Sequence, residues 1–101
     1  GTITETPGAV SSLRDAVAPN PFNPRTTIRL DVPRDGRVQL FVVDARGRVV
    51  RDLLDDELAA GSHRVAWDGR DRSGRGVAAG VYFGVVRQGD RRETVRMALV
   101  R

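Results

Sequence analysis

The sequence is divided into short segments in which apolar and polar residues alternate, and each segment ends at a turn signal. Ile28, Leu30 and Val32 alternate with polar neighbours, and Pro33 follows them directly. A period of two residues is typical of a half-buried strand, because successive side chains point to opposite faces of a sheet. No segment shows the period of 3.6 residues expected of a helix. The pattern therefore predicts an all-β fold.

The same pattern recurs often enough to predict the number of strands. The predicted strands cover residues 26–32, 38–44, 48–54, 61–67, 81–86 and 95–101, and a first strand is expected over residues 13–17. Short strands at spacings near ten residues favour a sandwich over a barrel or an α/β fold. We therefore expect a β-sandwich of six clear strands, or of seven if residues 13–17 also form one.

Turn chemistry and irregularities refine this prediction. Asp44 and Gly47 stand at the first and fourth positions of a turn, which suits a type I turn followed by a left-handed glycine. The doubled valine at 49–50 and the doubled leucine at 53–54 interrupt the alternation and predict a β-bulge. Residues 55–60 are acidic and too few for a stable helix, so we expect a connection there.

Two segments predict the centre of the core. Residues 81–86 are apolar on both faces, which is typical of a central strand covered on each side. His63, Val65 and Trp67 share one face of the strand at residues 61–67. Because the chain has few aromatic residues, we expect Trp67 and Tyr82 to be buried rather than to form a carbohydrate-binding platform.

The first part of the chain has a different character. Residues 1–12 are small and polar, without a period, and are typical of a linker. Residues 19–24 contain three prolines, which lack a backbone donor and exclude both a helix and a central strand. We expect an ordered crossing there, anchored by Phe22, and a single domain over residues 13–101.

Composition excludes several classes of function. The chain has 101 residues and no cysteine, so it holds neither a disulfide nor a thiolate metal site. No apolar run is long enough for a transmembrane helix, so membrane insertion is not expected. All 17 basic residues are arginine, but they are spread along the chain among 13 acidic residues. A dispersed surface of mixed sign lacks the focused field that nucleic-acid binding requires.

No constellation of residues indicates catalysis or a cofactor. The only histidine, His63, is adjacent to Ser62, which points to the opposite face of the strand and cannot complete a hydrolytic triad. The carboxylates at 55–57 are expected to be solvated. Calcium needs about six oxygen ligands, and the glycine-rich loop offers only the carboxylates Asp68 and Asp71, which can cap turns instead. We expect no catalytic residue, metal site or cofactor.

Several segments of the sequence, taken in their order along the chain, resemble a known family. The run Pro-Asn-Pro-Phe-Asn-Pro-Arg-Thr-Thr-Ile at residues 19–28 is similar to the opening of the C-terminal sorting domains of the bacterial type IX secretion system. The resemblance continues at residues 42–50, 61–69, 76–83 and 97–101. The immunoglobulin-like module of the flagellar hook-cap protein shares the same pattern.

The resemblance implies a seven-stranded, immunoglobulin-like, antiparallel β-sandwich with no enzyme activity. It implies a C-terminal domain that directs secretion or surface attachment of a larger protein of a Gram-negative-type bacterium. The implied partners are the secretion machinery or neighbouring domains, and the isolated domain is expected to be monomeric. The implied sorting signal consists of Gly80, Tyr82, Leu99, Val100 and Arg101. The alternatives are a structural spacer or assembly module like that of the hook cap, or a ligand-binding sandwich.

Overall fold

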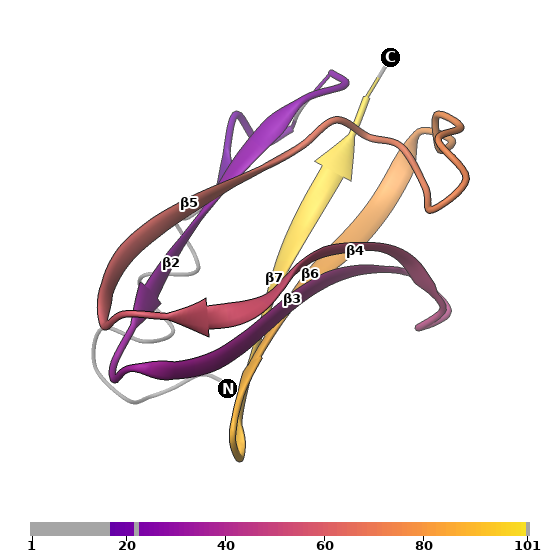
Figure 1. Cartoon of the computed structure of the whole chain (residues 1–101). Coiled ribbons are helices and arrows are strands. Elements are labelled where there is room, and N and C mark those ends of the chain that lie inside the picture. The colour runs from indigo at the N-terminus through magenta and orange to yellow at the C-terminus, as the bar shows by residue number, and fades with distance from the viewer. Residues whose placement is uncertain (1–16, 22, 101) are drawn as a thin grey trace.

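A computed structural model describes residues 17–21 and 23–100 of the chain and contains seven strands in this part (Figure 1). In chain order the strands are β1 Val17–Ala18, β2 Thr26–Val32, β3 Gly36–Asp44, β4 Val49–Leu58, β5 Gly61–Trp67, β6 Gly80–Gln88 and β7 Arg91–Leu99. None of the described residues forms a helix that could cross a bilayer. The all-β prediction is confirmed.

The strands form two antiparallel sheets that pack face to face. One sheet has the order β1-β2-β5 and the other has the order β4-β3-β6-β7. Figure 1 shows the two layers, with β2 and β5 on one side and β3, β6 and β7 on the other. The predicted seven-stranded sandwich is therefore confirmed.

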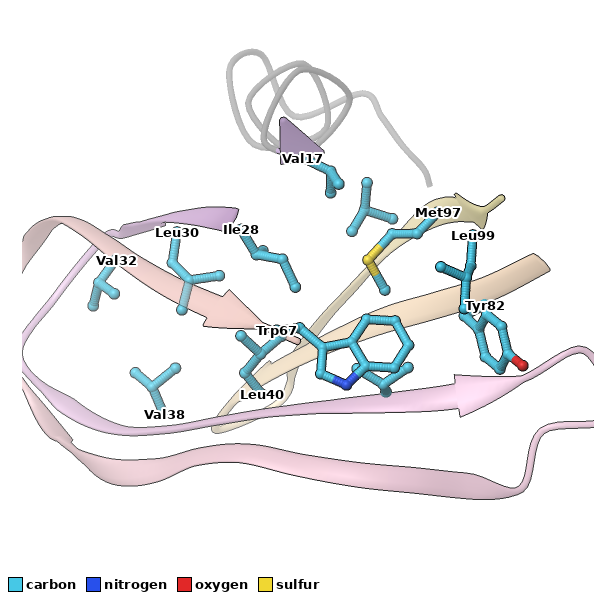
Figure 2. Close-up of a cluster of buried hydrophobic side chains, with 12 residues drawn as sticks. Val17, Ile28, Leu30, Val32, Val38, Leu40, Trp67, Tyr82, Met97 and Leu99 are labelled. Atoms are coloured by element: carbon cyan, nitrogen blue, oxygen red, sulfur yellow. The ribbon is translucent and has the colours of Figure 1, made fainter. Parts of the chain in front are cut away.

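The core fills the space between the sheets with alternate residues from each strand (Figure 2). In β2, Ile28, Leu30 and Val32 are buried, as their alternation predicts. The core residues contributed by the other strands are Val17, Val38, Leu40, Val42, Trp67, Tyr82, Val95, Met97 and Leu99. This removal of apolar surface from water is the main favourable term in folding.

Trp67 occupies the centre of this core. Its side chain is fully buried, and its indole N–H donates to the carbonyl of Arg70 at 3.0 Å. The Tyr82 ring of the opposite sheet meets it edge to face, with ring centroids 5.6 Å apart. The burial predicted for both aromatic residues is confirmed. Trp67 thus connects the two sheets while its only polar atom remains hydrogen-bonded.

The first strand begins where the prediction ended. The structure places β1 at Val17–Ala18 and pairs Val17 with Ile28. The remaining residues expected in this strand, 13–16, lie outside the described residues, as do the predicted linker at residues 1–12 and the predicted anchor Phe22.

The fourth strand is longer than predicted. Residues 55–58 continue β4, whereas the sequence pattern indicated a connection there. Asp55 pairs with Gln39 and Glu57 pairs with Arg37 in the ladder with β3. The guanidinium of Arg37 donates to the Asp55 carboxylate at 2.8 Å. Backbone pairing and this cross-strand charge pair hold an acidic segment in a strand, which local sequence alone does not indicate.

The irregularities in β3 and β4 agree with the sequence. The register between these strands shifts between Leu40 and Phe41 and again between Val42 and Val43. Each shift places an additional residue in β4, as the doubled apolar residues predicted.

The strand β6 has the predicted central position but only one fully buried face. It lies between β3 and β7 in the four-stranded sheet. Tyr82 and Gly84 face the core and are buried, whereas on the other face Val85 is buried but Val81 and Phe83 are only half-buried. The outer face of β6 is therefore only partly covered, because the sandwich has two layers rather than three.

The central position of Trp67 generates a stability prediction. We expect Trp67→Ala to lower the free energy of unfolding by about 3–5 kcal/mol, because it leaves a cavity between the sheets. Urea denaturation measures the change, and Val49→Ala, at a 40% exposed position of β4, serves as the control with a much smaller loss. A native fluorescence maximum at the wavelength of water-exposed tryptophan contradicts this assignment.

Candidate functional site

The structure brings three of the five residues of the implied sorting signal together. Gly80, the first residue of β6, pairs with Leu99, the last residue of β7. Tyr82 pairs with Met97 two positions further along the same ladder. They lie where β6 begins and β7 ends, at the end of the sandwich that holds the C-terminus (Figure 1). We therefore treat the carboxyl end of β7 as the candidate functional site.

The inner side of this site is firmly packed. Leu99 is 2% exposed and points into the core beside Tyr82 (Figure 2). The Tyr82 hydroxyl donates to the carbonyl of Ala78 at 2.6 Å, which fixes the segment that leads into β6. Val100 differs, because it follows the last strand and is 45% exposed. Arg101 lies outside the described residues. The buried part of the site is thus structural, and the exposed part begins at Val100.

A residue that the sequence did not single out holds the outer edge of β7. The Asn20 side-chain amide donates to the carbonyl of Arg96 at 3.1 Å, and its oxygen accepts from the amide of Ala98 at 3.0 Å. One side chain thereby pairs with an edge strand in the manner of a neighbouring backbone. The Thr26 hydroxyl donates to the carbonyl of Pro19 at 2.7 Å and supports this arrangement. We name these contacts the Asn20 clasp.

The only signal for the Asn20 clasp was the composition of the proline-rich segment. Pro19 and Pro21 flank Asn20 and cannot donate from their backbone nitrogens. A side chain with both a donor and an acceptor at that position is suited to pair with a strand edge. Its partner is 76 residues away in sequence, so the contact itself could not be read from local pattern.

Two turns with the same chemistry lie near this end of the sandwich. In the first turn, the carboxylate of Asp44 accepts from the backbone amides of Arg46 and Arg48 at 2.9 and 3.0 Å. The amide of Gly47 donates to the Asp44 carbonyl, and Gly47 has a φ of +86°. This φ lies in the left-handed region that glycine adopts without strain, and the predicted turn is confirmed.

The second turn repeats the pattern within the glycine-rich loop. The Asp71 carboxylate accepts from the Ser73 hydroxyl at 2.7 Å and from the amides of Ser73 and Arg75 at 2.9 and 3.0 Å. The amide of Gly74 donates to the Asp71 carbonyl, and the φ of Gly74 is +88°. This is the turn capping that the sequence analysis proposed in place of calcium binding.

Two other candidates for a metal ligand or a catalytic group, Asp68 and His63, also make contacts that support the backbone or a neighbouring side chain. Asp68 accepts from the Arg51 guanidinium and from the Arg70 amide, both at 3.1 Å. His63 is half-buried, and its Nε2 lies 2.7 Å from the carbonyl of Ala59. Within residues 17–21 and 23–100, no group of three or more His, Cys, Asp or Glu side chains is placed to hold a metal ion.

Comparison with known proteins identifies the family. The model of the FlgD Ig-like domain matches residues 24–90, which is well over half of the chain. The chain belongs to the FlgD Ig-like domain family. The basal-body rod modification protein FlgD of Salmonella typhimurium is 42% identical over 55 residues. This alignment covers 54% of the chain but only 23% of FlgD, so the chain spans about a quarter of the curated relatives that it matches.

Solved structures of FlgD Ig-like relatives and of type IX components share the fold. The structure of PorZ, an essential bacterial surface component of the type IX secretion system of Porphyromonas gingivalis, matches with a TM-score of 0.63 and 28% identity. It covers 94% of this chain and 13% of PorZ. FlgD from Xanthomonas campestris matches with a TM-score of 0.62 and 28% identity, over 85% of this chain and 63% of FlgD. The resemblance inferred from the sequence, both to type IX components and to the hook-cap protein, is confirmed.

The Asn20 clasp generates a prediction about β7. We expect Asn20→Ala to lower the free energy of unfolding by about 1–2 kcal/mol, because two hydrogen bonds at the strand edge are lost. We also expect faster hydrogen exchange at the Ala98 amide, measured by NMR. Asn23→Ala, an exposed asparagine of the same segment, is the matched control. Equal effects of the two substitutions contradict the clasp.

The turn at Asp71 generates a prediction about acid stability. Hydrogen bonds from the Ser73 hydroxyl and the Arg75 amide lower the pKa of the Asp71 carboxyl below its ordinary value. A lowered pKa in the folded state stabilises the protein above the unfolded value, and this stabilisation is lost as the pH falls through the folded value. We expect the wild type to melt at a higher temperature than Asp71→Asn at pH 6, with the difference shrinking between about pH 4 and pH 2.

The control for this pH dependence is Asp90→Asn, in the turn between β6 and β7 at the opposite end of β6. Its melting temperature is measured beside that of the wild type over the same pH range. A difference between wild type and Asp71→Asn that stays constant from pH 6 to pH 2 contradicts the assigned role of the carboxylate.

Proposed function

We propose that this domain directs the secretion or surface attachment of a larger extracellular protein and has no catalytic role. The observation that carries the proposal is the extent of the match to PorZ, which leaves only 6% of the chain unmatched and so extends into β7. The FlgD family model, by contrast, ends at residue 90, before β7 begins. The match to PorZ therefore extends at least into β7, the strand that carries Leu99 of the implied signal, although the FlgD structure of Xanthomonas campestris also covers 85% of this chain.

The geometry of the candidate site supports recognition of a folded signal. Leu99 is fixed in the core and the Asn20 clasp holds the β7 edge, so the direction in which the chain leaves the sandwich is defined. Val100 and Arg101 follow this fixed strand. A receptor in the secretion machinery would then bind a preorganised end and avoid much of the entropy cost of ordering a flexible tail.

The absence of catalysis in this proposal has structural support. His63 is on the face of β5 that points toward the core, and the Asp68 and Asp71 carboxylates cap turns or pair with Arg51. Each of these side chains is engaged in holding the backbone. The proposed partners are accordingly the secretion machinery and neighbouring domains, and the proposed location is the exterior of a Gram-negative-type bacterium.

A second candidate function is a structural assembly module, as in FlgD. Membership of the FlgD Ig-like family and the 42% identity to the Salmonella typhimurium protein favour it. The Xanthomonas campestris structure is described in terms of hook capping essential for flagellar assembly. In such a module, the function depends on the folded sandwich, and the last two residues carry no sorting signal.

A truncation separates the two functions. We expect deletion of Val100 and Arg101 to lower the free energy of unfolding by about 1 kcal/mol or less, because Val100 buries little apolar area. The same deletion should abolish export of a reporter fused to residues 13–101 in a host with a type IX machinery. Export is measured as the fraction of reporter outside the cells.

The control variant is Asp90→Ala, which changes an exposed residue at the opposite end of β7 and should leave export intact. Equal export with and without the last two residues, or no export of the intact fusion, would favour the assembly module. Loss of cooperative melting in the truncated domain would instead show that the two residues are structural.

A further inference from the structure

The outer face of the four-stranded sheet has an ordered arrangement that neither the core nor the candidate site uses. We define the outer face as the surface formed by the side chains of β4, β3, β6 and β7 that point away from β2 and β5. The ladders place these side chains in rows across the sheet, and three of the rows span all four strands. From β4 to β7 the rows are Val49–Val43–Phe83–Arg96, Asp52–Phe41–Val85–Thr94 and Asp55–Gln39–Arg87–Arg92.

The centre of the outer face is apolar. Phe41, Val43 and Phe83 are half-buried, and Val49 is 40% exposed. Val85 is 1% exposed but stands outside the core cluster, because its neighbours on the same face shield it. Two phenylalanines and the valines Val43 and Val49 form a contiguous apolar patch above the buried Val85, and the Arg87 guanidinium carbon lies 5.6 Å from the centroid of the Phe41 ring at the basic side of the patch. A contiguous apolar patch with a polar rim is typical of an interaction site.

The two edges of the outer face carry opposite charges. The β4 edge presents acidic groups, including Asp52 and Asp55, and the β7 side presents Arg87, Arg92 and Arg96. The acidic edge is partly neutralised, since Arg72 donates to Asp52 and Arg37 donates to Asp55, both at 2.8 Å. The basic side retains an excess of positive charge, and the face is therefore polarised from one edge to the other.

We propose that this face binds a second copy of the same chain, with the two-fold axis parallel to the strands. Such an axis turns the second sheet over, so that β4 of one copy lies opposite β7 of the other and each row keeps its position. Asp55 then faces the partner's Arg92, Val43 faces the partner's Phe83, and Phe41 faces the partner's Val85. The strands of the two sheets remain nearly aligned, which is a common geometry for packed sheets.

Charge selects this axis over the other face-to-face arrangement. An axis perpendicular to the strands leaves β4 opposite β4 and β7 opposite β7. Asp52 and Asp55 would then face the partner's acidic edge, and Arg92 would face the partner's basic edge. Opposed like charges disfavour this arrangement, whereas the first arrangement makes the interface self-complementary, as a two-fold dimer requires.

The size of the patch limits the strength of the dimer. Only four partly exposed apolar side chains form the centre of this face, which is a small apolar centre for a stable interface that buries roughly 1,200–2,000 Å² in total. Dimerisation is therefore weak and reversible, and the domain is monomeric when dilute. The prediction of a monomer in isolation then holds only at low concentration.

A charge-swap experiment tests the proposal on the 101-residue chain. Sedimentation velocity is recorded over a range of protein concentrations, from about 10 μM to about 1 mM. We expect the wild type to shift from the mass of one chain, 11.0 kDa, toward twice that mass. We expect Phe83→Arg to stay monomeric throughout, because it places a charge at the centre of the patch.

The edges of the face are tested by Asp55→Arg and Arg92→Asp, alone and together. Each single substitution places like charges opposite each other twice in the dimer and should weaken association at least tenfold. The double substitution restores the two opposed pairs and should recover association. Arg46→Ala, on the exposed turn between β3 and β4, is the control and should associate like the wild type. Thermal melting verifies that each variant is folded.

Each outcome of these measurements either supports or overturns the proposed dimer. Association of the wild type that both single substitutions weaken and the double substitution restores supports the proposed dimer. A wild type that remains monomeric at every concentration overturns it, and leaves the face to a different partner such as a neighbouring domain. Association that persists in Phe83→Arg, or that the double substitution fails to restore, overturns the proposed face or the proposed axis.

Discussion

The burial of Trp67 is the interaction on which the rest of the structure depends. The residue ends β5, pairs with Thr26 at the start of β2, and meets Tyr82 of the other sheet. Its indole N–H is satisfied by Arg70, so a large side chain is buried without an unpaired donor. Because Tyr82 also neighbours β7, the packing of one tryptophan sets the distance between the sheets at the end where the last strand leaves the fold.

The loops at that end derive their order from short-range chemistry rather than from a core. The two aspartate turns use one arrangement, in which a carboxylate collects backbone amides and a glycine takes a left-handed conformation. At the first turn, hydrogen bonds from the Arg48 and Arg46 amides lower the pKa of the Asp44 carboxyl. Such turns explain how carboxylates and glycines in a loop hold the backbone. They also show how a small sandwich without cysteine fixes its loops.

Much of the fold could be predicted from the sequence because alternation and turn residues are local signals. The strand β5 has the predicted bounds, and the turn at Asp44–Gly47 has the predicted geometry. The predictions from sequence fail where pairing with a segment distant in the chain determines the local structure. Asp55 belongs to β4 because β3 supplies partners, including Arg37, and the outer side of Phe83 is open because the sandwich has two layers. The candidate site was predicted as far as Gly80, Tyr82 and Leu99, whereas Asn20 could not be, since its contacts exist only after the chain has folded.

The Asn20 clasp has a consequence for the order in which the domain is completed. Asn20 is among the first described residues, and its partner Ala98 is 78 residues later in the chain. During synthesis, the β7 edge therefore has no clasp until nearly the whole domain has been made, and contacts of such long sequence separation form slowly because a large loop must close first. The clasp forms only when the segment around Asn20 and the end of β7 are both present. A chain that ends before Ala98 lacks the clasp, and the edge of its last strand stays open.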